Sequence, residues 1–176
     1  VGDGSLFVSD RAFNRVLFFL KPDGGDFISG QAANKVFGQP DFISTAAGSL
    51  ENRLNSPRHI SSDTDDRLYV CDTGNQRIQV FDRAPLAGPD PSAAITLPTP
   101  SAFPHGIFVS ALTGEIWVAT QNQYSVGGQL RQHRKFNDLV LNPNPEVILS
   151  TSEQPLAITL DSFGNMMAAF GTNRIA

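Results

Sequence analysis

The chain has 176 residues, 40% of them hydrophobic, which is enough for one sizeable core without requiring a second domain. Its 13 Lys and Arg against 17 Asp and Glu give a net charge of −4 with no long run of either sign, so a general affinity for nucleic acid or anionic membranes is not expected. The single cysteine, Cys71, excludes an intrachain disulfide and a cysteine-rich zinc cluster, and no apolar run approaches the roughly 18 residues of a membrane span.

The first predicted unit spans residues 1–38. Apolar runs at 6–8 and 16–19 are separated by turn-forming residues, which predicts two antiparallel strands, and residues 35–38 supply an outer strand. Residues 1–4 correspond to the turn before the second strand of a later unit. We therefore expect the chain to begin inside a repeat and to be part of a longer protein.

The second predicted unit, residues 55–98, is the most regular. Its first three strands begin near Ile60, Leu68 and Ile78, and an outer strand follows a proline-rich excursion. The segment 72–77 is rich in turn formers, and its Gly and Asn tolerate positive φ. Strands this short expose an apolar face, which must be covered by another part of the chain.

The third and fourth predicted units span residues 103–150 and 154–176. The third has clear strands at 107–109 and 116–119, each bounded by Gly or Pro, followed by a less regular third strand. The fourth repeats the first two strands, and its third strand is cut short at residues 174–176.

The four units are copies of one pattern. With Leu6, Leu68, Ile116 and Met166 taken as equivalent, the repeat advances by 62, 48 and 50 residues. Periods of about 40 to 50 residues with several short strands each are typical of β-propeller blades. We therefore expect an all-β fold, in which about four blades of four antiparallel strands form an incomplete arc of a probable six-bladed propeller. Such an arc leaves apolar faces that further blades or another chain would cover.

The residues that recur identify a family. The stretch 55–81 reads Pro-x-x-Ile, then Leu-Tyr-Val-x-Asp, then Gly-Asn-x-Arg-Ile-x-Val-Phe, and it resembles the NHL repeat. Residues 6–19 resemble it well, the two later copies resemble it in part, and residues 36–42 resemble a connection of its bacterial members. The resemblance implies four-stranded blades around a central channel. The fold hosts binding scaffolds, interaction platforms and a few lyases and hydrolases, so it does not fix the function.

Two acid–base pairs share one offset. Asp10 precedes Arg15 by five residues, and Asp72 precedes Arg77 by the same number. An Asp that closes one strand and an Arg that opens the next can face each other across the hairpin. Because the pair recurs in successive copies, we interpret it as a structural tie of the turn and not as catalytic machinery.

Three residues near the first strands are the candidate ligand-binding site. Arg58, His59 and His105 follow the prolines that lead into these strands, which line the channel in propellers. Pro104-His105-Gly106-Ile107 also resembles the zinc-ligand segments of peptidyl-hydroxyglycine amidating lyases. At the matching position only His105 is a histidine, whereas zinc needs three or four convergent ligands, so we expect no metal site from this residue alone.

One basic cluster lies in the third unit and consists of Arg131, His133, Arg134 and Lys135. We expect it to lie on a solvated outer strand, where a small anionic contact is the alternative.

Three hypotheses for function remain. The leading one is a non-catalytic scaffold that binds a protein, peptide or glycan through the channel mouth and the loops between blades, in the periplasm or outside a bacterium. The second is a structural subunit that associates with another chain. The third is a metal-dependent lyase or hydrolase with His105 as one ligand. No cofactor and no nucleic-acid partner are expected, because no phosphate loop, nucleophile elbow or dinucleotide fingerprint is present.

Overall fold

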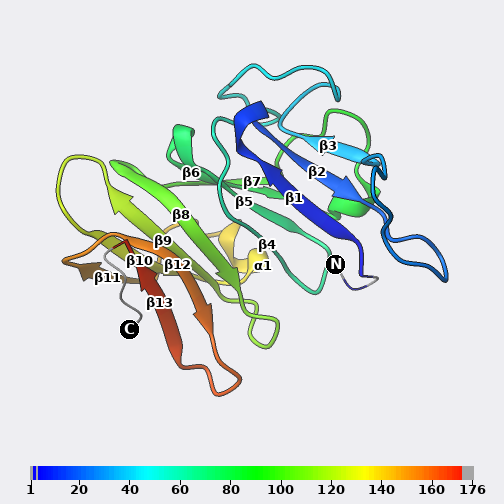
Figure 1. Cartoon of the computed structure of the whole chain (residues 1–176). Helices are drawn as coiled ribbons and strands as arrows, with labels where there is room; N and C mark the ends of the chain where they lie inside the picture. Colours follow the sequence, from blue (N-terminus) through cyan, green and yellow to red (C-terminus); the bar gives the residue numbers. More distant parts are fainter. Residues whose placement is uncertain (1, 3, 172–176) are drawn as a thin grey trace.

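The structure is a computed structural model that describes residues 2 and 4–171, and within them four antiparallel sheets follow one another along the chain (Figure 1). Sheets 1 to 4 contain three, four, four and two strands, and neighbouring sheets pack face against face in an arc that does not close. The all-β architecture predicted from the repeats is therefore confirmed. The strand expected at residues 174–176 lies outside the described residues.

Each sheet is a meander, in which consecutive strands are neighbours. Sheet 1 consists of β1 (Leu6–Asp10), β2 (Arg15–Phe19) and β3 (Lys35–Phe37). Sheet 2 consists of β4 (Ile60–Ser62), β5 (Leu68–Asp72), β6 (Arg77–Phe81) and β7 (Ile95–Pro98). Sheet 3 consists of β8 (Ala102–Val109), β9 (Ile116–Asn122), β10 (Gly128–His133) and β11 (Val147–Thr151). Sheet 4 consists of β12 (Pro155–Leu160) and β13 (Met166–Phe170).

Helical structure in the described residues is limited to short connections. They are the 3₁₀ turns η1 (Arg11–Phe13), η2 (Thr73–Asn75) and η3 (Ala84–Leu86) and the single α-helical turn α1 (Phe136–Leu139). No helix among them is long and apolar enough to cross a membrane.

The alternation of side chains along β5 explains why the sheets stack. Leu68 and Val70 belong to the core between sheets 1 and 2, whereas Tyr69 and Cys71 belong to the core between sheets 2 and 3. Successive strand residues point to opposite faces, so a strand covered on both sides is apolar at every position. A third core lies between sheets 3 and 4 around Leu130.

The turns that join β1 to β2 and β5 to β6 have the same backbone. Each contains a 3₁₀ turn closed by a left-handed residue with φ of 53°, which is Asn14 in the first turn and Gln76 in the second. The sequence predicted positive φ at Gly or Asn of the second turn, and the structure places it at Gln76 instead. Gly74 is required for space, since an added Cβ would lie 2.5 Å from the Asn55 side chain.

The basic cluster predicted to be solvated is only partly so. Arg131 and His133 are 8% and 1% exposed, whereas Arg134 and Lys135 are exposed. Arg131 lies opposite Val118 on the face of sheet 3 that packs toward sheet 2, and His133 follows two residues later on the same face. The expectation of a solvated outer strand is therefore wrong, because β10 is a covered inner strand of its sheet.

Candidate functional site

Two side-chain hydrogen bonds join neighbouring sheets near the ends of their strands. Ser9 Oγ donates to the carbonyl of Pro57 at 3.1 Å, and Thr73 Oγ1 donates to the carbonyl of Pro104 at 2.7 Å. The first bond joins the end of β1 to the segment before β4, and the second joins η2 to β8. We call the surface formed by Arg11, Arg58, His59 and His105 around these bonds the channel mouth.

The first strands are also tied together directly. His59 Nδ1 accepts a hydrogen bond from the Ile107 amide at 3.4 Å, and Ser61 Oγ accepts one from the Val109 amide at 3.2 Å. These amides lie on the edge of β8 that does not pair with β9. Side chains of sheet 2 therefore satisfy backbone donors of sheet 3 that no strand in the described residues pairs with.

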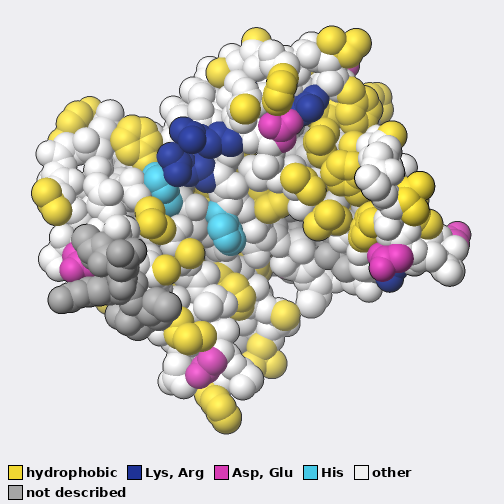
Figure 2. All heavy atoms as spheres, viewed as in Figure 1, with side chains coloured by type: hydrophobic (Ala, Val, Ile, Leu, Met, Phe, Trp, Pro, Cys, Tyr) yellow, Lys and Arg dark blue, Asp and Glu magenta, His cyan; other side chains and the backbone are white. Residues whose placement is uncertain are grey.

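Two arginines of the channel mouth have no acidic partner. In residues 2 and 4–171, neither Arg11 nor Arg58 has a carboxylate within ion-pair distance or a side-chain hydrogen bond, and both are exposed. Asp10 is the chain neighbour of Arg11, but it is engaged by Arg15. The positive charge of Arg11 adds to partial burial in lowering the pKa of Arg58, so the two guanidinium groups lie close enough to repel each other. Figure 2 shows Lys and Arg side chains gathered beside two histidines on this face.

Both histidines of the channel mouth are neutral at pH 7. Burial lowers the pKa of His105 to about 4, and the charges of Arg58 and Arg11 contribute to this shift. Burial also lowers the pKa of His59. The channel mouth thus carries two positive charges from its arginines. Each of its uncharged imidazoles has one nitrogen that can donate a hydrogen bond and one that can accept.

An apolar pocket of about 480 Å³ adjoins the channel mouth and shares His59 with it. Its walls come from β4, β8, β12 and β13, so three sheets contribute to it. The larger apolar side chains in the wall are Ile60, Ile107, Phe108, Ile158 and Met167. Figure 2 shows hydrophobic side chains next to the histidines on the same face.

The two predicted turn pairs are ion pairs in different environments. Arg15 Nε lies 2.9 Å from Asp10 Oδ2 at a partly exposed position. Arg77 Nε lies 2.6 Å from Asp72 Oδ2, and the Asp72 side chain is fully buried. Asp72 also accepts hydrogen bonds from the Asn55 amide and from Asn75 Nδ2. Burial raises the pKa of the Asp72 carboxyl against the opposite effect of these donors.

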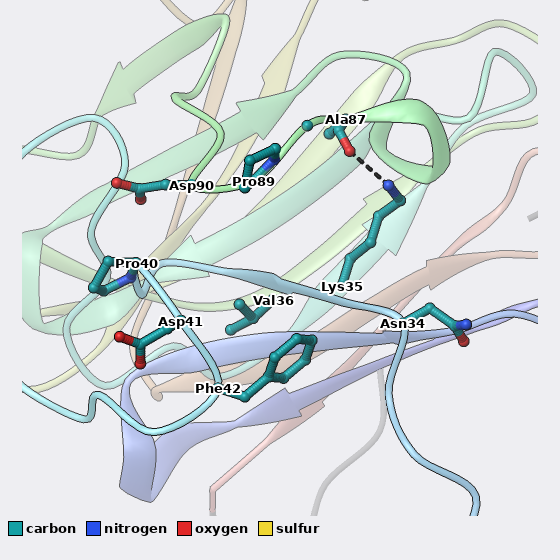
Figure 3. Close-up of a pocket in the computed structure, with 10 residues that line it drawn as sticks. Asn34, Lys35, Val36, Pro40, Asp41, Phe42, Ala87, Pro89 and Asp90 are labelled. Atoms are coloured by element: carbon teal, nitrogen blue, oxygen red, sulfur yellow. Dashed lines mark hydrogen bonds between the residues drawn. The ribbon is translucent and has the colours of Figure 1, made fainter.

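A second hollow of about 460 Å³ lies between sheets 1 and 2 near their outer strands (Figure 3). Lys35 Nζ donates to the Ala87 carbonyl at 2.6 Å across it. Asp41 accepts the amides of its own turn, and Asp90 is paired with Arg53. The charged side chains of this hollow are thus used in holding the loops together, whereas those of the channel mouth are not.

The described residues do not assemble a metal site. No group of three or more His, Cys, Asp and Glu among residues 2 and 4–171 could hold a metal ion. Arg58 and Arg11 lie close enough to His105 to influence its pKa, and their positive charge disfavours a second cation at that position.

The sequence indicated three of the four residues of the channel mouth, and Arg11 was missed. The charge of Arg58 acts on the pKa of His105, and His59 lines the apolar pocket. Binding of a ligand by these residues stays a prediction. Arg11 lies in η1, at the position that Thr73 occupies in η2. Because the second copy has Thr at this position, the repeat pattern carries no sign of a charged residue there.

Comparison with known proteins agrees with the geometry. The model of the NHL repeat matches residues 54–81. No curated protein matches the sequence. Among solved structures, a streptogramin B lyase is 12% identical with a TM-score of 0.58 over 100% of this chain and 51% of that one. A catalytically inactive H270A virginiamycin B lyase from Staphylococcus aureus, with quinupristin, is 13% identical with a TM-score of 0.54 over 100% and 52% of the two chains.

These likenesses concern the fold. The chain spans about half the length of the solved structures that it resembles, and sequence identities this low do not transfer an activity. The stacked antiparallel sheets, the recurrent turn and the matched repeat agree with one another. The chain therefore carries an NHL repeat within an open arc of β-propeller blades.

Proposed function

We propose that the protein is a non-catalytic propeller scaffold that binds a protein, peptide or glycan partner through its channel mouth, with Arg58, His59 and His105 among the contact residues. The observation that supports this proposal is the exposed pair of arginines without acidic partners, placed beside an apolar pocket of about 480 Å³. Concave sites with apolar walls and a few convergent polar groups are typical of ligand binding.

The state of the other reactive side chains favours binding over catalysis. Cys71 is fully buried, and burial raises the pKa of its thiol well above the ordinary value, so it is not a ready nucleophile. Burial lowers the pKa of His105 to about 4, and it is therefore a weak general base near pH 7. Bacterial origin and a place outside the cytoplasm stay predictions of the sequence.

A role as a structural subunit is the second candidate, and one observation favours it. Sheet 4 and its neighbour β11 expose Ile148, Leu149, Leu156 and Met167, which are 50%, 42%, 39% and 40% exposed. Exposed apolar side chains on strands can be covered by another chain, and large apolar patches often mark an interaction surface. Light scattering, which measures the molar mass in solution, separates this candidate from the first one. A structural subunit of this type would form a larger assembly, whereas a scaffold with a free channel mouth could stay a monomer.

Binding is tested with a displayed peptide library and a glycan array, using the wild type as bait. Any ligand selected is then measured against an Arg58→Ala/His105→Ala variant and against an Arg83→Gln variant. The Arg83 side chain is 77% exposed, and within the part of the chain that the structure describes its ion-pair partner is its neighbour Asp82, so Arg83→Gln serves as a matched loss of surface charge. We expect at least tenfold weaker binding by the first variant and unchanged binding by the second. Equal binding by both variants would place the site elsewhere.

A further inference from the structure

The charges of the described arginines divide into two groups. Six arginines have a carboxylate within ion-pair distance: Arg15, Arg53, Arg67, Arg77, Arg83 and Arg134. Arg131 is buried and bonds to Gln129 through Nε. Only Arg11 and Arg58 of residues 2 and 4–171 remain without either kind of side-chain bond, and the Ser9 bond to the Pro57 carbonyl holds their chain segments together.

We propose that Arg11 and Arg58 bind an oxyanion, a carboxylate or a phosphate group, carried by a ligand whose apolar part occupies the pocket between β4, β8, β12 and β13. This proposal rests on the proposed function, since it assigns the chemistry of the ligand to the same channel mouth. Guanidinium groups match carboxylate and phosphate oxygens with paired N–H donors, so two of them can hold one oxyanion from two sides.

The position of the two arginines is fixed by the fold. Arg11 follows β1 directly, and the Ser9 bond to Pro57 holds the end of that strand against the residue before Arg58. The Asn14 side chain accepts the Ser56 amide at 2.7 Å, which anchors the same segment a second time. The Arg58 amide donates to the Cys71 carbonyl at 3.0 Å and extends the ladder between β4 and β5. Two sheets thus each hold the backbone of one arginine, and the two backbones are tied to each other.

The electrostatics of the free protein favour an anion at this place. Two neighbouring positive charges without a counter-charge repel each other, and partial burial of Arg58 strengthens that effect. An oxyanion relieves the repulsion, whereas a cationic or neutral head group does not. His105 carries no charge near pH 7, so it does not contribute to the attraction, which comes from the arginines.

The apolar pocket defines the other half of the ligand. It adjoins the channel mouth through His59, and its wall includes Ile60, Phe108 and Met167. Burial of an alkyl or aromatic group there adds affinity in proportion to the apolar area removed from water. The combination predicts a ligand with one anionic end and one apolar end.

The test uses three probes with the same chain: octanoate, octyl phosphate and 1-octanol, titrated into the protein by calorimetry. We expect one or both of the anions to bind and 1-octanol to bind at least tenfold more weakly. Binding of octanoate alone assigns the site to carboxylates, and binding of octyl phosphate alone assigns it to phosphates. Binding of both shows that the site recognises the negative charge and does not distinguish the two oxyanions.

Arg11→Gln and Arg58→Gln are the test variants, and Arg83→Gln is the control. We expect about tenfold weaker anion binding for each test variant, because each loses charge-assisted hydrogen bonds. Both should unfold at the same or a higher temperature than the wild type, since each removes a repulsion and no bond that the structure shows. Salt should weaken anion binding by the wild type more than by either variant.

The proposal would be overturned by 1-octanol binding as tightly as the anions, or by variants that bind the anions like the wild type. Absence of binding by all three probes would overturn it as well. The proposed function fails in a different way, since library or array ligands would then be insensitive to the channel-mouth variants. Neutral ligands that depend on Arg58 and His105 would support the function and refute the oxyanion.

Discussion

The buried ion pair of the second turn should contribute far more to stability than its exposed counterpart in the first turn. In an Asp72→Ala variant the Asn55 amide, Asn75 Nδ2 and Arg77 Nε lose an acceptor, at 2.7, 2.8 and 2.6 Å respectively. At about 1.5 kcal/mol for each of the three hydrogen bonds to a charged group, the free energy of unfolding falls by about 4.5 kcal/mol. For a chain of this size, that corresponds to a melting temperature lower by about 10 °C.

The matched variant is Asp10→Ala, which removes the same residue type from the equivalent position of the first turn. Asp10 has Arg15 as its ion-pair partner, and 24% of its side chain is exposed, so the expected loss is about 0.5 kcal/mol. Urea denaturation of both variants, followed by circular dichroism, measures the difference. Equal losses, or a loss below about 1 kcal/mol for Asp72→Ala, would refute the reasoning that burial and shared bonds decide the strength of this pair.

Three further predictions concern packing and protonation. Gly128→Ala should lower the free energy of unfolding by several kcal/mol, because the added Cβ would collide with the backbone of β9. Gly88→Ala should be neutral in the same urea assay, because an added Cβ at Gly88 would have no heavy atom within 4 Å. Burial lowers the pKa of His133 to about 4, below its value of about 6.5 in the unfolded chain, so the contribution of this residue to stability is fully present above about pH 6.5. It falls by up to about 3 kcal/mol as the pH drops toward 4. His133→Phe should flatten this dependence in urea titrations at pH 7 and 4.5, and an unchanged slope would contradict the prediction. Arg58→Gln should raise the pKa of His105 above about 4 in an NMR titration, and an unmoved pKa would show that the guanidinium does not act on the ring.

The fold was accessible from the sequence because its information is local and repeated. The strand that begins at Leu68 and the one that begins at Ile78 appear as apolar runs between turn formers, and the structure places β5 and β6 there. Repetition of the pattern then indicated the stacking of sheets. No comparable local signal existed for the burial of Arg131 and His133, because it depends on the sheet that packs against β10.

The candidate site was only partly accessible for the same reason. Arg58 and His105 were candidates because each follows a proline near a predicted first strand, which is a feature of the repeat, and their role in binding stays a prediction. The structure extends that strand in the third unit to Ala102–Val109, so Pro104 and His105 lie within β8. Arg11 belongs to a turn in another copy, and only the folded arrangement brings it close to them. The lack of an acidic partner for Arg11 among the described residues is likewise a property of the fold, since its chain neighbour Asp10 is engaged by Arg15.

The side chains of His59 and Ser61 that cap the free edge of β8 have a consequence for how the arc is assembled. An uncapped edge is a template for adventitious pairing with other chains, which is a common route to aggregation. Since the caps of sheet 3 reside on sheet 2, sheet 3 is protected only when its predecessor is already in place. Folding of these two sheets should therefore be cooperative, and a variant that loosens sheet 2 should make the protein prone to aggregate through sheet 3.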